Sequence, residues 1–292
     1  MSALTPVAQP EVWLVVAGLV AGYAAALGAW GRQLAPSGVA STGRQRLYFA
    51  LGVGLAWLVG DGIVGALATD LLTVRALQSV VLVTLAAPLL LLGLPGWLLR
   101  RLLAPPRVRR FWQGLTRPLV AFLAVHAWVV LAHLPVVLEA TASTAPLRAA
   151  TLLGALGIGL VLWWPVLSPL PELPALPHAG VLAYLAGHAL APAVPASLLT
   201  FASTHHVAGY AASAAALGAT PLLDQQLAGA AVKVAGTALL TVACAAIVAR
   251  WSHEEETGGP DLRVWRDLAN AIPTSGSEPR SPQPRLEGHR RS

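Results

Sequence analysis

The sequence predicts an all-α, polytopic membrane protein: a bundle of seven transmembrane helices with the N-terminus outside and the C-terminus in the cytoplasm. Of its 292 residues, 56% are hydrophobic and only 11% are charged, and the mean hydropathy is +0.66. A soluble globular domain carries about 25% charged residues. The apolar runs are continuous rather than alternating, which favours helices over a β-barrel.

Each predicted span is an apolar run that approaches the roughly 20 residues a bilayer requires. The first has no basic segment before it and is expected to be a retained helix rather than a cleaved signal. Asp61 lies between two glycines and is expected to loosen the second span, and Trp163, Trp164 and Pro165 predict an interfacial end for the fifth. The spans cover about residues 12–30, 47–67, 71–94, 118–138, 145–167, 180–201 and 222–248.

The chain is expected to divide after the last span. Residues 1–251 form the transmembrane domain, and residues 252–292, rich in Glu, Pro, Ser and Arg, form a cytoplasmic, largely disordered tail. Arginines collect in the links after spans one and three, whereas the links on the opposite side hold only Arg148. The positive-inside rule therefore places the N-terminus outside. The net charge of +6 is explained by these topology-determining arginines, so it does not indicate nucleic-acid binding. The expected partner of the transmembrane surface is membrane lipid.

This orientation brings polar residues from several segments to one depth, the extracytoplasmic third. Because residues four apart share a helix face, Arg75 and Ser79 point the same way. If these faces turn inward, they form one outer polar pocket. Its members would be Arg75, Ser79, His133, Arg148, His205, His206, Asp224, Gln225 and Gln226.

Several of these residues have a purely structural alternative. Arg75 could snorkel to the headgroups or form an ion pair with Asp224. His133 precedes Leu134 and Pro135 and could simply end a helix. His126 lies two turns deeper, where a histidine more often hydrogen-bonds to a neighbouring helix than binds a metal. His188 is expected on the cytoplasmic side, away from the outer pocket.

Three stretches resemble one family of membrane proteins. The runs LVTLAAPLLLLGLP, WWPVL and especially PLLDQQLAG, together with the step His133–Leu134–Pro135, resemble the CtaG-type cytochrome c oxidase assembly factors of Gram-positive bacteria. The resemblance covers about Leu47 to Glu256. It implies a non-enzymatic accessory factor in the cell (plasma) membrane, with cytochrome c oxidase subunits as partners. Such a factor delivers copper to the outer-side copper centre or acts as a metal-free scaffold.

The chain departs from the family at the start of span three. Family members usually carry an H-x-x-x-H pair there, where this sequence reads TVRALQS, so Arg75 and Ser79 stand in place of the histidines. Arginine stays protonated and cannot ligate a metal. Copper binding therefore depends on His133, His205 and His206 with Asp224, and a scaffold with Arg75 paired to Asp224 is the competing hypothesis.

Two other classes of membrane protein also have helix bundles of this kind. A retinal protein would need Lys233 as its Schiff-base lysine, usually with a carboxylate one turn earlier, where this chain has Gly229. A small-solute transporter would use the outer pocket as its entry, but no internal repeat is visible and carboxylates are scarce within the spans. The sequence contains no G-x-S-x-G motif and no Gly-rich phosphate loop, so an enzyme is not expected.

Overall fold

The computed structural model describes residues 8–35, 39–191 and 193–256. The chain divides into two compact units, Met1–Ile247 and Val248–Ser292. The described part of the second unit is the end of helix α15 (Pro221–Glu256). The remainder of the predicted tail lies outside the described residues.

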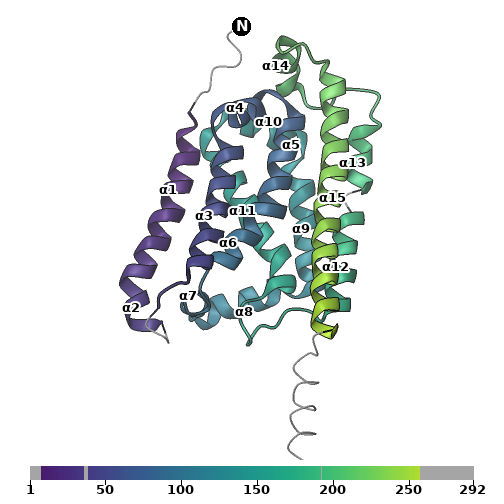
Figure 1. Ribbon diagram of the computed structural model, residues 1–292. Coiled ribbons are helices and arrows are strands. Elements are labelled where there is room, and N and C mark those ends of the chain that lie inside the picture. The colour runs from purple at the N-terminus through teal and green to yellow at the C-terminus, as the bar shows by residue number, and fades with distance from the viewer. Residues whose placement is uncertain (1–7, 36–38, 192, 257–292) are drawn as a thin grey trace, which may run out of the picture. The chain divides into compact units, whose positions relative to one another are not determined.

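Helices make up the regular structure of the described residues, which confirms the all-α membrane class (Figure 1). Helix α11 (Ala145–Leu167) packs against α6 (Ala87–Gly93), against the π-helix η2 (Leu82–Ala86) that precedes α6, and against α9 (Pro118–Ala132). The remaining elements are α1 (Pro10–Ala25), η1 (Ala26–Trp30), α2 (Gly31–Leu34), α3 (Gly43–Gly60), α4 (Gly62–Asp70), α5 (Leu72–Val81), α7 (Gly96–Leu102), α8 (Pro106–Leu115), α10 (Pro135–Ser143), α12 (His178–Leu190), α13 (Ala193–Thr200), η3 (Ala208–Tyr210) and α14 (Ala211–Ala216).

Among the described residues, four helices are long and apolar enough to cross a membrane on their own. They are Pro10–Gly28, Leu72–Gly93, Ala145–Leu167 and Pro221–His253. Counting each bent helix pair as one span raises the number to six. The predicted number of seven spans stays a prediction, because the sixth predicted span consists of two short helices, α12 and α13. The predicted orientation of the termini also stays a prediction.

The second and fourth predicted spans are each interrupted. Helices α3 and α4 meet at an angle of 48° at Asp61, where Gly62 adopts a φ of +60°, a left-handed conformation that glycine tolerates best. The predicted loosening at this point is confirmed. The fourth predicted span, about residues 118–138, is divided: α9 ends at Ala132 and α10 begins at Pro135, so His133 ends a helix, as the structural alternative for this residue predicted. Proline has no backbone N–H to continue the helix ladder.

The two tryptophans near the end of the fifth span are buried. Trp163 and Trp164 are 5% and 3% exposed, so they pack inside the protein instead of facing lipid, and the interfacial end of the span stays a prediction. The indole N–H of Trp163 donates to the carbonyl oxygen of Val83, in η2, at 3.0 Å. In a π-helix the backbone hydrogen bonds run from residue i to i+5 instead of i+4, so a carbonyl such as that of Val83 can accept from a side chain. Such bulges often mark functional sites.

Candidate functional site

Asp224 caps the start of α5 from another part of the chain. Its carboxylate accepts hydrogen bonds from the backbone N–H groups of Leu72, at 2.7 Å, and Thr73, at 3.0 Å. Leu71, which precedes α5, provides no side-chain cap of its own. A carboxylate at a helix N-terminus satisfies free donors and complements the helix dipole. Asp224 is therefore committed to holding α15 against α5.

Arg75 forms a different set of contacts from those expected. Its guanidinium donates to Gln78 Oε1 at 2.7 Å and to Thr151 Oγ1 at 2.6 Å. The amide of Gln78 in turn donates to the carbonyl of Val59 at 2.7 Å. The ion pair between Arg75 and Asp224, one of the two structural alternatives for this arginine, is absent from the described residues. The neighbouring Ser79 hydroxyl donates back to the carbonyl of Arg75 at 3.2 Å. The arginine thus joins α5 to α11 through neutral partners.

Arg148 forms an ion pair at this end of the bundle. Its Nε lies 2.7 Å from the Oε1 atom of Glu11, a residue that is only 7% exposed. The pair ties the start of α1 to the start of α11. Glu11 was not among the predicted site residues, although a carboxylate directly before an apolar run was the available signal.

The two glutamines at the start of α15 hold the preceding loop. Gln225 accepts the backbone N–H of His206 at 2.7 Å and donates to the carbonyl of Thr204 at 3.2 Å. Gln226 donates to the carbonyl of Ala202 at 3.0 Å. The His206 side chain is exposed. In the part of the chain that the structure describes, no group of three or more His, Cys, Asp or Glu residues is placed to hold a metal ion.

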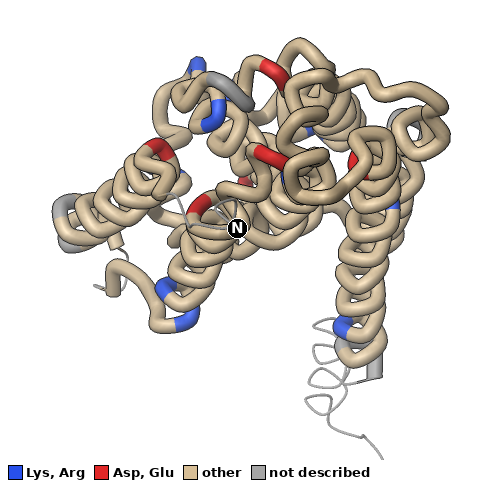
Figure 2. Tube along the Cα trace, turned by 90° about the horizontal axis from the view of Figure 1, so that it is seen from above, with Lys and Arg blue, Asp and Glu red and all other residues tan. Residues whose placement is uncertain are grey.

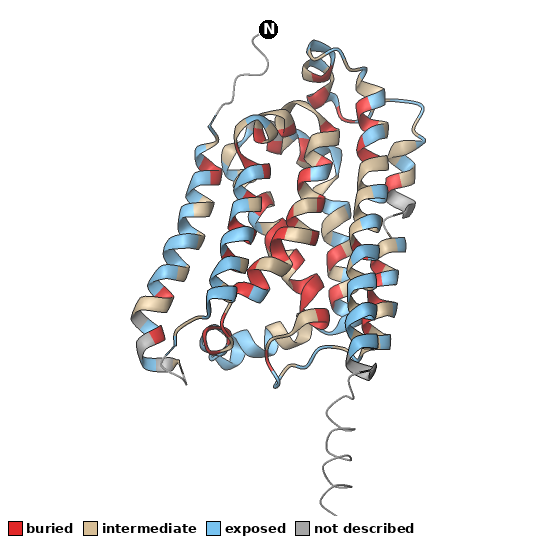
Figure 3. Cartoon of the chain, in the orientation of Figure 1, coloured by how far each residue is buried: buried red, intermediate tan, exposed pale blue. Residues whose placement is uncertain are grey.

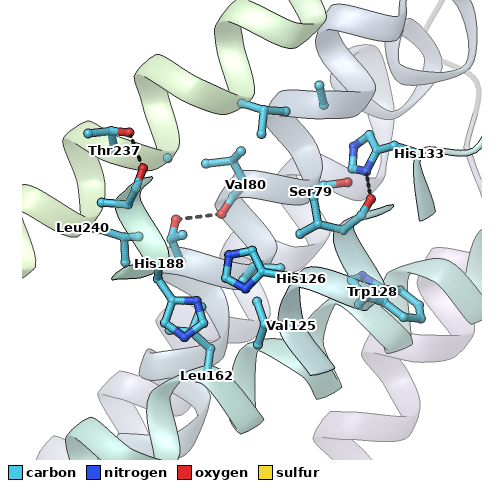
Figure 4. A pocket seen from close by; sticks show the side chains of 17 residues that line it. Ser79, Val80, Val125, His126, Trp128, His133, Leu162, His188, Thr237 and Leu240 are labelled. Atoms are coloured by element: carbon cyan, nitrogen blue, oxygen red, sulfur yellow. Dashed lines mark hydrogen bonds between the residues drawn. The ribbon is translucent and has the colours of Figure 1, made fainter. Parts of the chain in front are cut away.

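A different set of histidines lines one cavity inside the bundle (Figure 4). His126 belongs to α9, His133 follows the last residue of α9, and His188 belongs to α12. The cavity has a volume of about 80 Å³, and Ser79 and Thr237 also line it. Most of its remaining wall is apolar. The structure therefore brings the predicted His133 and Ser79 together with two histidines that were expected to lie elsewhere.

The hydrogen bonds of two of these histidines define which nitrogen is free. The Nδ1 atom of His126 lies 2.7 Å from the carbonyl oxygen of Phe122, and that of His133 lies 2.8 Å from the carbonyl oxygen of Val129. A carbonyl oxygen only accepts, so we assign the proton to Nδ1 in both rings. Each Nε2 then keeps a lone pair.

His188 is buried without a hydrogen-bond partner. It is 2% exposed, and its Nε2 atom finds no partner among the described residues. Its ring stacks on that of His126, with ring centroids 5.0 Å apart and planes 15° apart. Tyr184 meets His188 edge-on at 4.4 Å, and Phe122 lies 4.9 Å from it. A buried polar atom without a partner is costly, so it calls for an explanation.

Sequence reasoning missed this histidine set for two reasons. The positions of His126 and His133, seven residues apart, correspond to the same face of a helix, and this signal was available. His188 was excluded because the depth of its helix was misjudged. The π-helix η2 contributes Val83 and Thr84 to the same cavity, and no sequence pattern had indicated it.

The retinal alternative finds no support in this geometry. Lys233 lies on the exposed side of α15, outside the cavity wall. A Schiff-base lysine has to face an enclosed chromophore site. Gly229, one turn earlier, packs so closely on α13 that a Cβ atom there would lie 2.5 Å from the carbonyl oxygen of Ala196.

Comparison with known proteins identifies the family. A family model described as cytochrome c oxidase caa3 assembly factor (Caa3_CtaG) matches residues 21–254. No curated protein and no solved structure matches the chain significantly. The family match covers most of the chain and includes every helix that lines the histidine cavity. The chain belongs to the cytochrome c oxidase caa3 assembly factor (Caa3_CtaG) family.

Proposed function

We propose that this assembly factor handles copper for the oxidase, and that the ion is its cargo rather than a resident cofactor. The observation that carries the proposal is that His126, His133 and His188 line one cavity, in which the rings of His126 and His188 stack with centroids 5.0 Å apart. In their present positions the three do not form a metal-holding group, so binding requires side-chain rotation. Imidazole nitrogen is a good ligand for copper. Two of the rings are oriented by a bond from Nδ1 to a backbone carbonyl, the support that metal-binding histidines usually have.

The donor set fits a monovalent ion better than a divalent one. No Asp or Glu lines the cavity, so its ligands are neutral. The cost of burying an ion in an apolar region grows steeply with its charge. Cu(I) is therefore the expected form. The nearly parallel rings of His126 and His188 need a rotation about one Cβ–Cγ bond before their lone pairs converge, and this torsion is soft.

The outer polar pocket supports a structural role instead. Asp224 caps a helix, Arg75 bridges α5 and α11, and Gln225 holds the loop of His206. In this proposal His205, His206 and Asp224 do not bind copper. Of the four metal ligands predicted from the sequence, only His133 lines the histidine cavity. The protein acts in the plasma membrane with oxidase subunits as partners and has no catalytic step of its own.

The experiment is complementation of a strain that lacks this protein. Oxidase activity and oxidase copper content are measured with the normal chain, with the double variant His126→Ala/His188→Ala, and with His205→Ala/His206→Ala as the matched control. We expect the cavity variant, His126→Ala/His188→Ala, to lose oxidase activity and oxidase copper. The loop variant, His205→Ala/His206→Ala, should retain both. Excess copper is expected to restore activity in the deletion strain, because it replaces delivery.

A metal-free scaffold predicts the opposite pattern. A deletion strain that copper fails to rescue, together with full oxidase activity in the cavity variant, would overturn copper handling. Membrane levels of each variant, measured by immunoblot, separate loss of function from loss of the protein.

A further inference from the structure

Helix α8 lies across one end of the bundle and has two chemically different sides. It meets α9 at an angle of 80°, and α9 runs along the bundle (Figure 1), so α8 lies nearly parallel to the membrane plane. Four apolar residues fall within an arc of about 100° around its axis: Val108, Phe111, Trp112 and Leu115. Arg110 lies on the opposite side, and Arg107 and Arg109 lie on the two flanks. This pattern is typical of a helix that rests in the headgroup region of a bilayer.

Only part of the apolar side of α8 packs inside the protein. The ring of Trp112 meets that of Trp164 edge-on, with centroids 5.2 Å apart. Phe111, in contrast, is 67% exposed, and Figure 3 shows exposed residues along this helix. An apolar ring at the surface, level with arginines, suits the boundary between lipid headgroups and acyl chains. The exposed part of α8 is therefore a surface for lipid.

A cavity of about 190 Å³ lies between α8, α7 and the link that follows α11. Arg109 lines it from α8, Arg100 from α7 and Glu172 from the link. The rest of its wall is apolar and consists of Leu103, Ala104, Leu170 and Leu173. The cavity thus combines charged groups with an apolar lining, as the headgroup and glycerol region of a lipid requires.

The cavity contains one positive charge in excess. Arg100 Nε lies 2.8 Å from Glu172 Oε1, and this hydrogen bond, with the charge of Arg109 adding to it, holds the pKa of the Glu172 carboxyl below its usual value. The guanidinium of Arg109 forms no hydrogen bond or ion pair with any described residue. Figure 2 views the bundle from the opposite end, where the other acidic residues whose exposure is described lie. They are Glu11, Asp61, Asp70, Glu139 and Asp224.

We propose that this cavity binds the phosphate group of an anionic phospholipid, with the guanidinium of Arg109 as its principal contact. A guanidinium donates two parallel hydrogen bonds to phosphate oxygens, and the single negative charge of a phosphodiester matches the excess charge of the cavity. Because α8 lies at the membrane surface, a lipid headgroup reaches this depth while its acyl chains lie beside Phe111. This site is separate from the histidine cavity and does not depend on copper handling.

The test titrates the purified full-length protein, in detergent micelles, with phosphatidylglycerol or phosphatidylethanolamine and counts bound lipid by native mass spectrometry. We expect phosphatidylglycerol to bind more tightly, because the arginines repel the ammonium group of phosphatidylethanolamine. Arg109→Gln should weaken phosphatidylglycerol binding at least about tenfold, since charge-assisted hydrogen bonds are lost. Arg109→Lys, which keeps the charge without the two parallel donors, should have an intermediate affinity. The matched control is Arg107→Gln, on the other flank of α8, with a smaller expected loss.

Glu172→Gln provides a prediction of opposite sign. It releases Arg100 to the phosphate, so phosphatidylglycerol should bind more tightly than to the normal chain, a gain that a misfolded variant would not give. Equal losses in Arg107→Gln and Arg109→Gln would show only the general attraction of a basic surface for anionic lipid, and the proposed site would be wrong. Equal affinity for the two lipids, or displacement of the lipid by inorganic phosphate at the same concentration, would exclude an anionic phospholipid as the ligand.

Discussion

Replacing Asp224 by alanine is expected to destabilise the protein through the N-terminus of α5. The carboxylate accepts two backbone hydrogen bonds, from Leu72 and Thr73. Leu72 is 1% exposed, so its N–H is left without a partner or water, at a cost of about 1–3 kcal/mol. The N–H of Thr73 is only partly buried, so losing its hydrogen bond lowers the free energy of unfolding by about 0.5–1.5 kcal/mol. Losing the charge at the helix N-terminus lowers it by about 0.3–1 kcal/mol more. The expected loss is about 2–5 kcal/mol.

The assay is unfolding of the purified protein in mixed micelles at increasing SDS content, followed by circular dichroism. Asp224→Asn serves as the intermediate case, because it keeps one carbonyl acceptor and removes the charge. We expect it to lose about half as much stability, roughly 1–2 kcal/mol. The hydrogen bond from Thr73 Oγ1 to the backbone carbonyl of Asp224, at 2.9 Å, is untouched in both variants.

This experiment also separates the structural role of Asp224 from metal binding. If Asp224 were a metal ligand, its replacement would lower the amount of copper that the purified protein retains. The unfolding midpoint would then stay close to that of the normal protein. If Asp224→Ala unfolds like the normal chain and binds less copper, the assignment of its carboxylate to the start of α5 is wrong.

Two further predictions concern packing and charge. Gly154→Ala should cost about 1–3 kcal/mol or more, because its Cβ would lie 1.9 Å from the ring of Trp128, whereas Gly157→Ala in the same helix meets nothing within 4 Å and should be neutral or stabilising by up to about 1 kcal/mol. Arg148→Ala should cost about 3–5 kcal/mol, because Glu11 stays buried without its cation. The same unfolding assay measures all three, and equal midpoints for the two glycine variants would contradict the packing at Trp128.

The fold class followed from composition because continuous apolar runs allow few alternatives in a membrane. The bend at Gly62 was also predictable, since glycine beside Asp61 is a local signal. The division of the sixth predicted span has a local signal in Pro192 and Pro195, since proline interrupts a helix. The π-helix at Leu82–Ala86 has no such signal, because the donor to its Val83 carbonyl is Trp163, 80 residues further along the chain.

At the predicted outer end, the depth of the polar residues was predictable and their partners were not. Residue counting placed Arg75 and Asp224 near the same level. It gave no information on the rotation of each helix about its axis, which decides which groups meet. In the structure Arg75 turns to Thr151 on α11, and Asp224 turns to the start of α5. Opposite charges at one depth are therefore weak grounds for an ion pair.

The histidine cavity was within reach of the same residue counting. Helices α9 and α12 begin at Pro118 and His178, at the same end of the bundle, as Figure 1 shows. Along these helices His126 lies about 12 Å and His188 about 15 Å from the start, at a rise of 1.5 Å per residue. Both side chains therefore reach the middle of the membrane. Histidine at that depth needs a partner, and the stacked rings meet this need only in part, since the Nε2 atom of His188 has none. Trp112 Nε1 and Trp164 Nε1 are unpartnered in the same way among the described residues, but an indole N–H only donates, so of the three nitrogens only that of His188 could ligate the proposed cargo ion.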